Sequence, residues 1–412
     1  MPMVMTSVDG YGVGGPAAVL MAGGRSEVGA VREPVIVAMA RTPIGRRGGS
    51  LAGLKAVALL RHVQEAVIAR AGIEPGTIDQ IIGGCVTQAG EQSLNVTRNA
   101  WLNSGLDVEV PAITVDASCG SSQQASHLAA ALIAAGQAEC VLSCGVESMS
   151  RVPIGVNLTN GPGHYKTRDY RWDDPPHAQF GGAERIAGRE GLDRAELDAY
   201  GVRSQRLAAQ AWARDALAAE IAPLQAPKDG EVRLVERDEG PRDTSPAGLA
   251  ALRPTIDGAR HTAGTSSQVS DGAAALLWMS RGRAESLGLR PRARIAHQVV
   301  TGSDPYYLLD GPIVATRKLL ARAGMRLDDI DRYEVNEAFA AVVLAWQRRY
   351  DADEDRLNVN GGAIALGHPL GASGARLLIS AVHELERAGA EHALVTMCCG
   401  GALGTATLLQ RL

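Results

Sequence analysis

Residues 116–125 read DASCGSSQQA, and the segments on either side of this stretch decide the fold. An apolar run at 110–115 precedes it and predicts a buried strand, and an Ala-rich run at 122–135 follows it and predicts a helix. Cys119 therefore lies at a turn from strand to helix, where Gly120 permits close approach of the backbone. Because a helix start carries partial positive charge, we expect the pKa of Cys119 to lie below its ordinary value of ~8.5. The turn alone is also compatible with a cysteine that is simply buried and has no chemical role.

Three later stretches carry further reactive residues. Residues 335–340 read VNEAFA, residues 361–374 read GGAIALGHPLGASG, and residues 396–404 read TMCCGGALG. A cysteine in a strand-to-helix turn, followed by these motifs in this order, resembles the thiolase family over about residues 33–412. The resemblance implies the thiolase fold, an α/β fold of two duplicated halves in α-β-α-β-α layers with an inserted loop domain.

The predicted elements repeat within the chain. The first copy has strands at 110–115 and 139–144 around a helix at 122–135, and the second has strands at 356–359 and 392–397 around a helix at 371–388. Each copy places one reactive residue, Cys119 or His368, in the equivalent turn. Strands that alternate with helices also predict a mainly parallel sheet.

Composition changes along the chain divide it into four parts. They are a disordered N-terminal extension at 1–32, an N-terminal half at 33–149 completed by 261–284, an excursion at 150–260, and a C-terminal half at 285–412. The resemblance implies that the excursion is the loop domain, which covers the substrate in the family. Within the loop domain, the pattern at 183–212 predicts a helix.

The composition excludes several classes of protein. A net charge of −4 gives no electrostatic case for binding nucleic acid or an anionic membrane surface. No run approaches the ~18 apolar residues of a membrane span. The six cysteines form no Cys-x-x-Cys pair, so we expect no metal site, and their sparse use suits a cytoplasmic location.

The chemistry of thioesters suggests roles for the motif residues. A Cys thiolate is both a soft nucleophile and a good leaving group, so Cys119 is the candidate nucleophile. His368, in a rigid Gly/Pro turn, is the candidate base. A thiol can also exchange a proton with a carbanion, and the residues alone leave Cys398 and Cys399 as equal candidates. The family motif selects Cys398.

The resemblance assigns the remaining site residues. It implies one oxyanion hole from His368 and a water held by Asn336, and another from the backbone N–H groups of Cys119 and Gly400. It also implies coenzyme A contacts, from Ala263, Gly264, Ser267, Phe339, Arg242 and Phe180. Ala402 replaces a glycine of the family motif, which we expect to be tolerated if its φ is negative.

The expected function is that of a 3-ketoacyl-CoA thiolase with ping-pong chemistry, with CoA and acyl-CoA as substrates and no permanently bound cofactor. The loops look most like those of actinobacterial thiolases that shorten steroid side chains, and we expect the paired glycines of 179–182 to leave room for a bulky acyl group. Thiolases are dimers or tetramers, so a homo-oligomer is expected. The alternatives are a general fatty-acid β-oxidation thiolase, a short-chain biosynthetic thiolase, a decarboxylating ketoacyl synthase of the same fold, and a non-catalytic acyl-CoA carrier. The late cysteine and the Asn-Glu-Ala-Phe motif argue against the synthase, and the presence of Cys119, His368 and Cys398 argues against the carrier.

Overall fold

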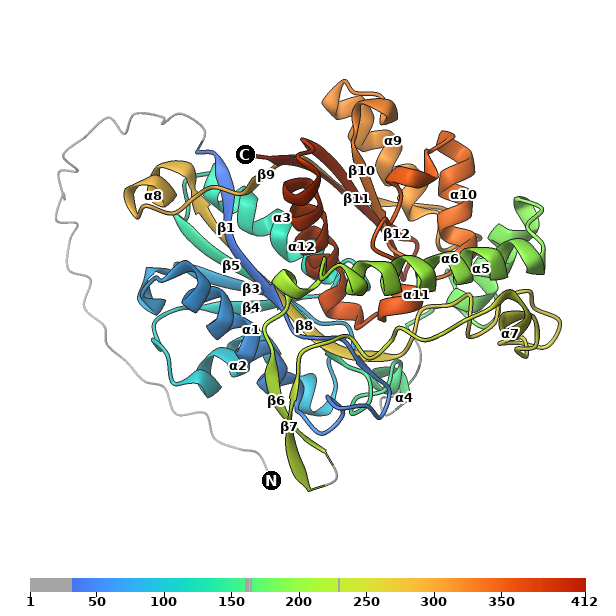
Figure 1. The fold of residues 1–412 in the computed structure, drawn as a ribbon, viewed down its shortest axis with the longest axis horizontal. Coiled ribbons are helices and arrows are strands. Elements are labelled where there is room, and N and C mark those ends of the chain that lie inside the picture. The colour runs from blue at the N-terminus through green and yellow to red at the C-terminus, as the bar shows by residue number, and fades with distance from the viewer. Residues whose placement is uncertain (1–31, 160–162, 164, 229) are drawn as a thin grey trace, which may run out of the picture. The chain divides into compact units, whose positions relative to one another are not determined.

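The computed structural model describes residues 32–159, 163, 165–228 and 230–412, so the predicted N-terminal extension, apart from Arg32, lies outside the described residues. A ten-stranded sheet runs through the described part, with the path β10-β11-β12-β9-β1-β8-β5-β3-β4 and β2 beside β8 (Figure 1). Its strands are β1 (Pro34–Arg41), β2 (Gly45–Arg46), β3 (Gln80–Gly84), β4 (Ala112–Val115), β5 (Cys140–Ser148), β8 (Ser270–Ser280), β9 (Ala293–Gly302), β10 (Arg332–Val335), β11 (His392–Cys399) and β12 (Leu403–Arg411).

The sheet consists of two halves with the same topology. In the first, β3 pairs in parallel with β4 and β5, and β8 pairs antiparallel with β5 and β1. In the second, β10 pairs in parallel with β11, and β12 pairs antiparallel with β11 and β9. Among the described strands, the two half-sheets pair with each other only at Val35–Arg294 and Ile36–Ala293, between β1 and β9. The internal repeat predicted from the sequence is therefore present in the strand order.

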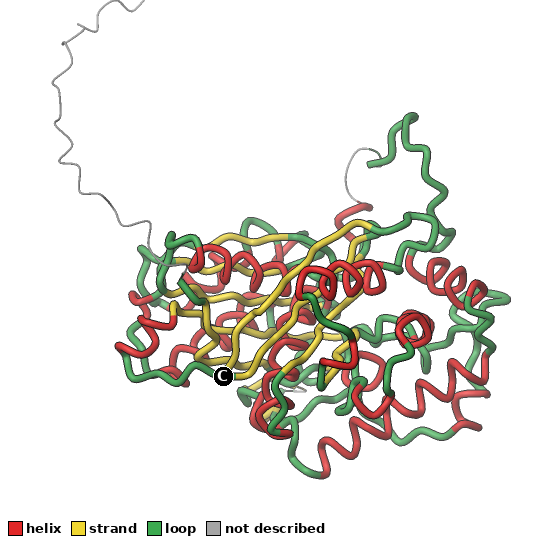
Figure 2. The backbone as a smooth tube through the Cα atoms, turned by 90° about the horizontal axis from the view of Figure 1, so that it is seen from above, coloured by secondary structure: helices red, strands yellow, loops and turns green. Residues whose placement is uncertain are grey.

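Helices cover both outer faces and fill the space between the half-sheets. In Figure 1, α1 and α2 lie on one side, α9 and α10 on the other, and α3 and α12 in the middle. Figure 2 shows the strands gathered together with helices around them. These helices are α1 (Ala56–Ala71), α2 (Val96–Ser104), α3 (Ser121–Ala134), α9 (Gly311–Ala323), α10 (Ala340–Tyr350) and α12 (Leu370–Ala388).

The buried apolar residues follow the same layers. One cluster joins α1 and α2 to the first half-sheet, a second joins α9 and α10 to the other, and a third packs α3 and α12 between them. Most side chains of α12 are buried, because sheet or helix surrounds it. The result is the α-β-α-β-α arrangement expected from the sequence.

Three local predictions were wrong. The sheet is mixed rather than mainly parallel, because β8 and β12 return antiparallel beside the parallel strands. The strand expected at 356–359 is reduced to two isolated bridges, Leu357 with Tyr333 and Val359 with Gly361. The single helix expected at 183–212 is two helices, α5 (Gln179–Arg189) and α6 (Arg194–Ala213), because Gly191 turns left-handed (φ +64°) and Asp193 caps a new helix through Glu196.

The region between β5 and β8 holds α5 and α6, a hairpin of β6 (Leu224–Lys228) and β7 (Glu231–Val235), and the short helices α4 (Val156–Thr159) and α7 (Pro246–Ala250). Two more short helices are α8 (Arg281–Ser286) and α11 (Ala363–Leu366). The exact division into halves and loop domain stays a prediction. Among the described residues, every helix is too short or too polar to cross a bilayer.

Candidate active site

Cys119 lies in the turn between β4 and α3, as the sequence predicts. Ser118, directly before it, is left-handed at φ +50°, and Gly120 is the N-cap of α3. A Cβ on Gly120 would lie 2.7 Å from Sγ of Cys399, so the tight approach requires glycine. The thiol is 2% exposed.

The pKa of Cys119 does not fall as the helix start predicts. Its pKa is raised to about 12, mainly by burial, and the Glu147 and Asp116 carboxylates contribute in the same direction. The backbone N–H groups of Gly400 and of Cys119 itself oppose this rise by hydrogen bonding to the sulfur. The prediction of a lowered pKa was therefore wrong, because desolvation of the thiolate outweighs the helix start. The two predicted amide donors do meet at Sγ.

His368 is held in one orientation by its surroundings. Its backbone N–H donates to the Oγ of Ser270 (3.1 Å), and its Nδ1 lies 2.6 Å from the Oγ of Ser373. Because the Ser373 hydroxyl donates to the carbonyl of Pro369 (2.8 Å), it accepts from Nδ1–H. Burial lowers the pKa of His368 to about 3, with a smaller contribution from Arg376, so the ring is neutral and Nε2 carries the lone pair.

Asn336 follows β10 and faces the imidazole. Its Nδ2 donates to Nε2 of His368 at 3.3 Å, and its buried Oδ1 has no hydrogen-bond partner among the described residues. An unsatisfied buried acceptor beside a reactive ring fits a water or a substrate group. The neighbouring Glu337 accepts from Tyr200 (2.9 Å) and Ser204 (2.6 Å), which fixes this segment against α6.

The turns that present Cys119 and His368 are brought together by the first turns of α3 and α12. The N–H of Ala375 donates to the Oγ of Ser122 at 2.8 Å. The N–H of Gly371 donates at 2.9 Å to Glu147, whose carboxylate also accepts from the N–H of Val86 and Thr87 (both 3.0 Å). Equivalent turns of the two halves therefore meet between the half-sheets.

Cys398 and Cys399 are the last residues of β11. Both lie close to Cys119, because a negative charge on Cys119 raises the pKa of each of them. They point to opposite faces of the strand: Cys398 joins the cluster of Ala338 and Phe339, and Cys399 joins the cluster of Cys119. Burial raises the pKa of Cys398 well above its ordinary value. The geometry brings both candidates to the site, and the choice of Cys398 stays a prediction.

Ala402 departs from expectation. Its φ is +56°, not negative, a conformation that costs a residue with a Cβ about 1–2 kcal/mol. Its carbonyl accepts from the N–H (2.7 Å) and the Oγ (3.0 Å) of Ser303, which hold the turn in place.

Most of the predicted CoA contacts line two adjoining cavities. A cavity of about 570 Å³ is lined by Phe180, Arg242, Ala263 and Ser267, and one of about 280 Å³ by Arg242, Ala263 and Gly264. Phe339 is 4% exposed and lies beneath Phe180, with ring centroids 5.2 Å apart, so it supports the cavity rather than lining it.

The cavity also has lining residues that the sequence did not single out. Arg46, Arg47 and Gln268 line the larger cavity, and Leu249 and Leu252 line the smaller. The paired arginines of the glycine-rich stretch at 45–49 were a usable signal for a site that binds phosphate groups. The carbonyl of Gln268 accepts from the N–H of His368 (3.3 Å), which places one wall of the cavity against the histidine turn.

The paired glycines at 181 and 182 do not leave room for substrate. A Cβ on Gly181 would lie 1.8 Å from the carbonyl oxygen of Pro176, and one on Gly182 would lie 2.8 Å from that of Tyr307. These glycines instead allow the backbone of α5 to pack closely against its neighbours. The prediction that they leave room for a bulky acyl group was therefore wrong.

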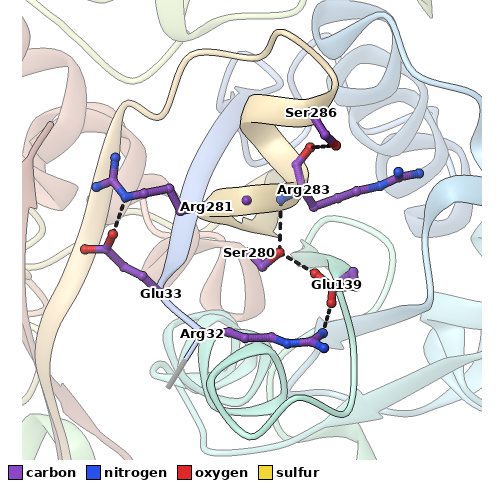
Figure 3. Close-up of a pocket in the computed structure, with 8 residues that line it drawn as sticks. Arg32, Glu33, Glu139, Ser280, Arg281, Arg283 and Ser286 are labelled. Carbon is purple, nitrogen blue, oxygen red and sulfur yellow. Dashed lines mark hydrogen bonds and ion pairs between the residues drawn. The ribbon is translucent and has the colours of Figure 1, made fainter. Parts of the chain in front are cut away.

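A cavity of about 440 Å³ lies at the far end of β8 (Figure 3). Ser280, at the end of β8, lines this cavity. Ser270, at the start of β8, accepts from the N–H of His368, and ten residues of strand separate the two serines by roughly 33 Å. The side chains of Arg32 and Glu139, and of Arg281 and Glu33, pair with one another in Figure 3. This cavity is therefore separate from the candidate site.

The site combines a buried thiol, a neutral imidazole and a second thiol with a groove large enough for a ligand. Such a site can transfer an acyl group from one thiol to another, which is the reaction of an acyltransferase. The family model of the thiolase N-terminal domain matches residues 34–282, and the family model of the thiolase C-terminal domain matches residues 289–411. The chain belongs to the thiolase family.

Known proteins resemble the whole described fold. The steroid 3-ketoacyl-CoA thiolase FadA6 of Mycobacterium tuberculosis is 41% identical, over 99% of this chain and 100% of its own. An acetyl-CoA acetyltransferase of Syntrophomonas wolfei is 40% identical over 92% of this chain and 100% of its own. The crystal structure of the Bacillus anthracis acetyl-CoA acetyltransferase matches with a TM-score of 0.85 at 36% identity, covering 93% of this chain and 100% of that one. Human mitochondrial 3-ketoacyl-CoA thiolase matches with a TM-score of 0.84 at 34% identity, covering 92% and 99%.

Proposed function

We propose that this protein is a 3-ketoacyl-CoA thiolase that cleaves its substrate with CoA, or runs the reverse condensation. The observation that carries the proposal is the contact between the two helices that follow Cys119 and His368, where the N–H of Ala375 donates to Ser122, together with the amide of Gly400 directed at the Cys119 sulfur. Because the thiol and the imidazole are both neutral, the thiol proton passes to Nε2 as the sulfur attacks.

The first half-reaction forms an acyl enzyme. Sγ of Cys119 adds to the 3-keto carbon, and its proton moves to His368. The C2–C3 bond then breaks, the departing carbanion takes a proton from Cys398, and acetyl-CoA leaves. In the second half-reaction, the CoA thiol gives its proton to the Cys398 thiolate and attacks the acyl group. Cys119 leaves as a thiolate and recovers its proton from His368.

Charge that develops on oxygen is met by two sets of donors. The N–H groups of Cys119 and Gly400 serve the carbonyl at the nucleophile, and each such donor is worth about 10²–10³ in rate. The other set comprises protonated Nε2 of His368 and a water on Asn336, whose Oδ1 is otherwise unsatisfied. Coenzyme A lies in the groove of Arg242, Ala263, Gly264, Ser267 and Phe180, supported by Phe339.

The substrate is a long or ring-bearing 3-ketoacyl-CoA. Support comes from the match to a steroid thiolase over nearly the whole chain. The competing short-chain biosynthetic role is favoured by the acetyl-CoA acetyltransferases that match at similar identity. Thiolysis of acetoacetyl-CoA, a long-chain and a ring-bearing 3-ketoacyl-CoA, followed at the enolate absorbance, decides between them. A higher kcat/KM for acetoacetyl-CoA than for both others defeats this assignment, and no turnover of any favours a carrier.

The assembly is a homodimer or homotetramer. Support comes from β4, whose outer edge is unpaired among the described strands and whose Ile113 side chain is 40% exposed. An unpaired edge with an apolar residue invites pairing with another strand. Light scattering measures the mass directly, and a monomer refutes the assignment. The six free, buried thiols support placing the protein in a reducing cytoplasm.

A further inference from the structure

Two polar side chains beside Cys119 have no role in the proposed reaction. Beside Gly400, the position that a Cβ would occupy lies 3.0 Å from the Oγ of Ser118 and 3.4 Å from the Nε2 of Gln179. Neither polar group has a hydrogen-bond partner in the described part of the chain, and both residues are half-buried. A hydroxyl and an amide without partners of their own therefore converge on the space beside the Cα of Gly400, where a side chain would be in tight contact with Ser118.

This space adjoins the acyl carbonyl of an acyl enzyme. Ser118 directly precedes Cys119, and the N–H of Gly400 is directed at the Cys119 sulfur. The nitrogen and the Cα of Gly400 are only ~1.5 Å apart, so a group over this Cα lies next to a carbonyl bound by this N–H.

The space lies away from the CoA groove. Phe180 lines that groove with Ser267, whereas its neighbour Gln179 approaches Gly400 instead. With CoA in the groove, the part of the substrate that meets Gln179 is the acyl group retained on Cys119.

Backbone conformation holds both side chains in place. Ser118 (φ +50°) and Ala178 (φ +51°), which precedes Gln179, are left-handed although neither is glycine. Such conformations persist where the surrounding structure enforces them, and they gather at functional sites. Here they aim one side chain from each side at the same space.

We propose that Ser118 and Gln179 form a polar subsite for an oxygen atom of the acyl group. The preferred substrate is then a 3-ketoacyl-CoA with a hydroxyl, ketone or ether oxygen a few carbons beyond the 3-keto carbon. This inference rests on the proposed thiolase function and specifies its substrate class, since a site built to hydrogen-bond an oxygen discriminates against a methylene.

The test compares 3-ketooctanoyl-CoA with its analogue that has an ether oxygen in place of the C6 methylene. The parent enzyme should show a kcat/KM about five- to tenfold higher for the ether, the range of one or two neutral hydrogen bonds. Gln179→Met, which has similar size but no amide, should reduce that ratio to about one. Ser118→Ala should reduce it in part. Gln225→Met, on the exposed side of β6, is the matched control and should keep the parent ratio.

Equal kcat/KM values for both substrates in the parent enzyme, or an unchanged ratio in Gln179→Met, overturn the inference. Failure to cleave either substrate is a different result, because it overturns the thiolase assignment itself.

Discussion

Replacing Ser373 with alanine isolates the part of the site that orients the base. The Ser373 hydroxyl accepts from Nδ1–H of His368 at 2.6 Å and donates to Pro369 at 2.8 Å, which leaves Nε2 as the proton acceptor. Without it, either the buried Nδ1–H has no partner or the proton moves to Nε2. Both outcomes weaken the base that faces the substrate.

The size of the effect follows from burial. An unsatisfied buried donor costs about 1–3 kcal/mol. If this cost falls on the reactive arrangement of the ring, acylation of Cys119 slows by roughly 5- to 150-fold. The pKa of His368 should stay low, because burial is its main cause.

The assay is single-turnover acylation, with quenching at set times and the mass of the Cys119 peptide as readout. Ser380→Ala is the matched control: Ser380 is also buried on α12, but its hydroxyl donates to Glu220 at 3.0 Å, away from His368. Both variants should lose similar unfolding free energy, and only Ser373→Ala should acylate slowly. Acylation of Ser373→Ala at the parent rate, or an equal loss in Ser380→Ala, would refute the assigned orientation.

Other variants test the remaining roles. Cys119→Ala should gain no acyl mass from an acyl-CoA; labelling that persists in this variant contradicts its role as nucleophile. Cys398→Ala should block turnover yet still acylate at Cys119, and if Cys399→Ala is the inactive variant instead, the proton donor is Cys399. Burial lowers the pKa of His127 to about 3, so from about pH 6.5 downward the unfolded chain binds a proton that the folded protein does not, and stability falls. His127→Gln should therefore lose about 2 kcal/mol less unfolding free energy than the parent between pH 7 and pH 5, measured by denaturant titration; equal losses contradict this account.

The local parts of this site could be predicted from the sequence, since a strand, a turn and a helix are encoded by neighbouring residues. Cys119 and His368 lie in the expected turns for that reason, and the repeat of the pattern revealed the two halves. The break between α5 and α6 was also encoded locally, because Asp193 and Glu196 have the spacing of a capping box. The apolar periodicity obscured it.

The features that the sequence missed depend on distant residues. The direction of β8 is set by β1 and β5, which lie far away in the chain, whereas β12 forms a hairpin with β11. The raised pKa of Cys119 comes from burial under the opposite half, which no local pattern reports. The role of Gly182 is set by Tyr307, more than a hundred residues away, and the φ of Ala402 by hydrogen bonds from Ser303.

The joint between the half-sheets, only two residue pairs long, has a mechanical consequence. The middle helices also hold the two halves together: a Cβ on Gly374 of α12 would lie 2.4 Å from the backbone nitrogen of Gln123 on α3, and the Gln123 amide donates to the carbonyl of Val395 at 3.1 Å. Cys119 lies directly before the start of α3, and His368 lies directly before the start of α12. A small shift of α3 against α12 therefore changes the distance between the nucleophile and the base, even when each half keeps its own structure. Substitutions in this middle layer can thus alter the rate of acyl transfer although they never touch the substrate.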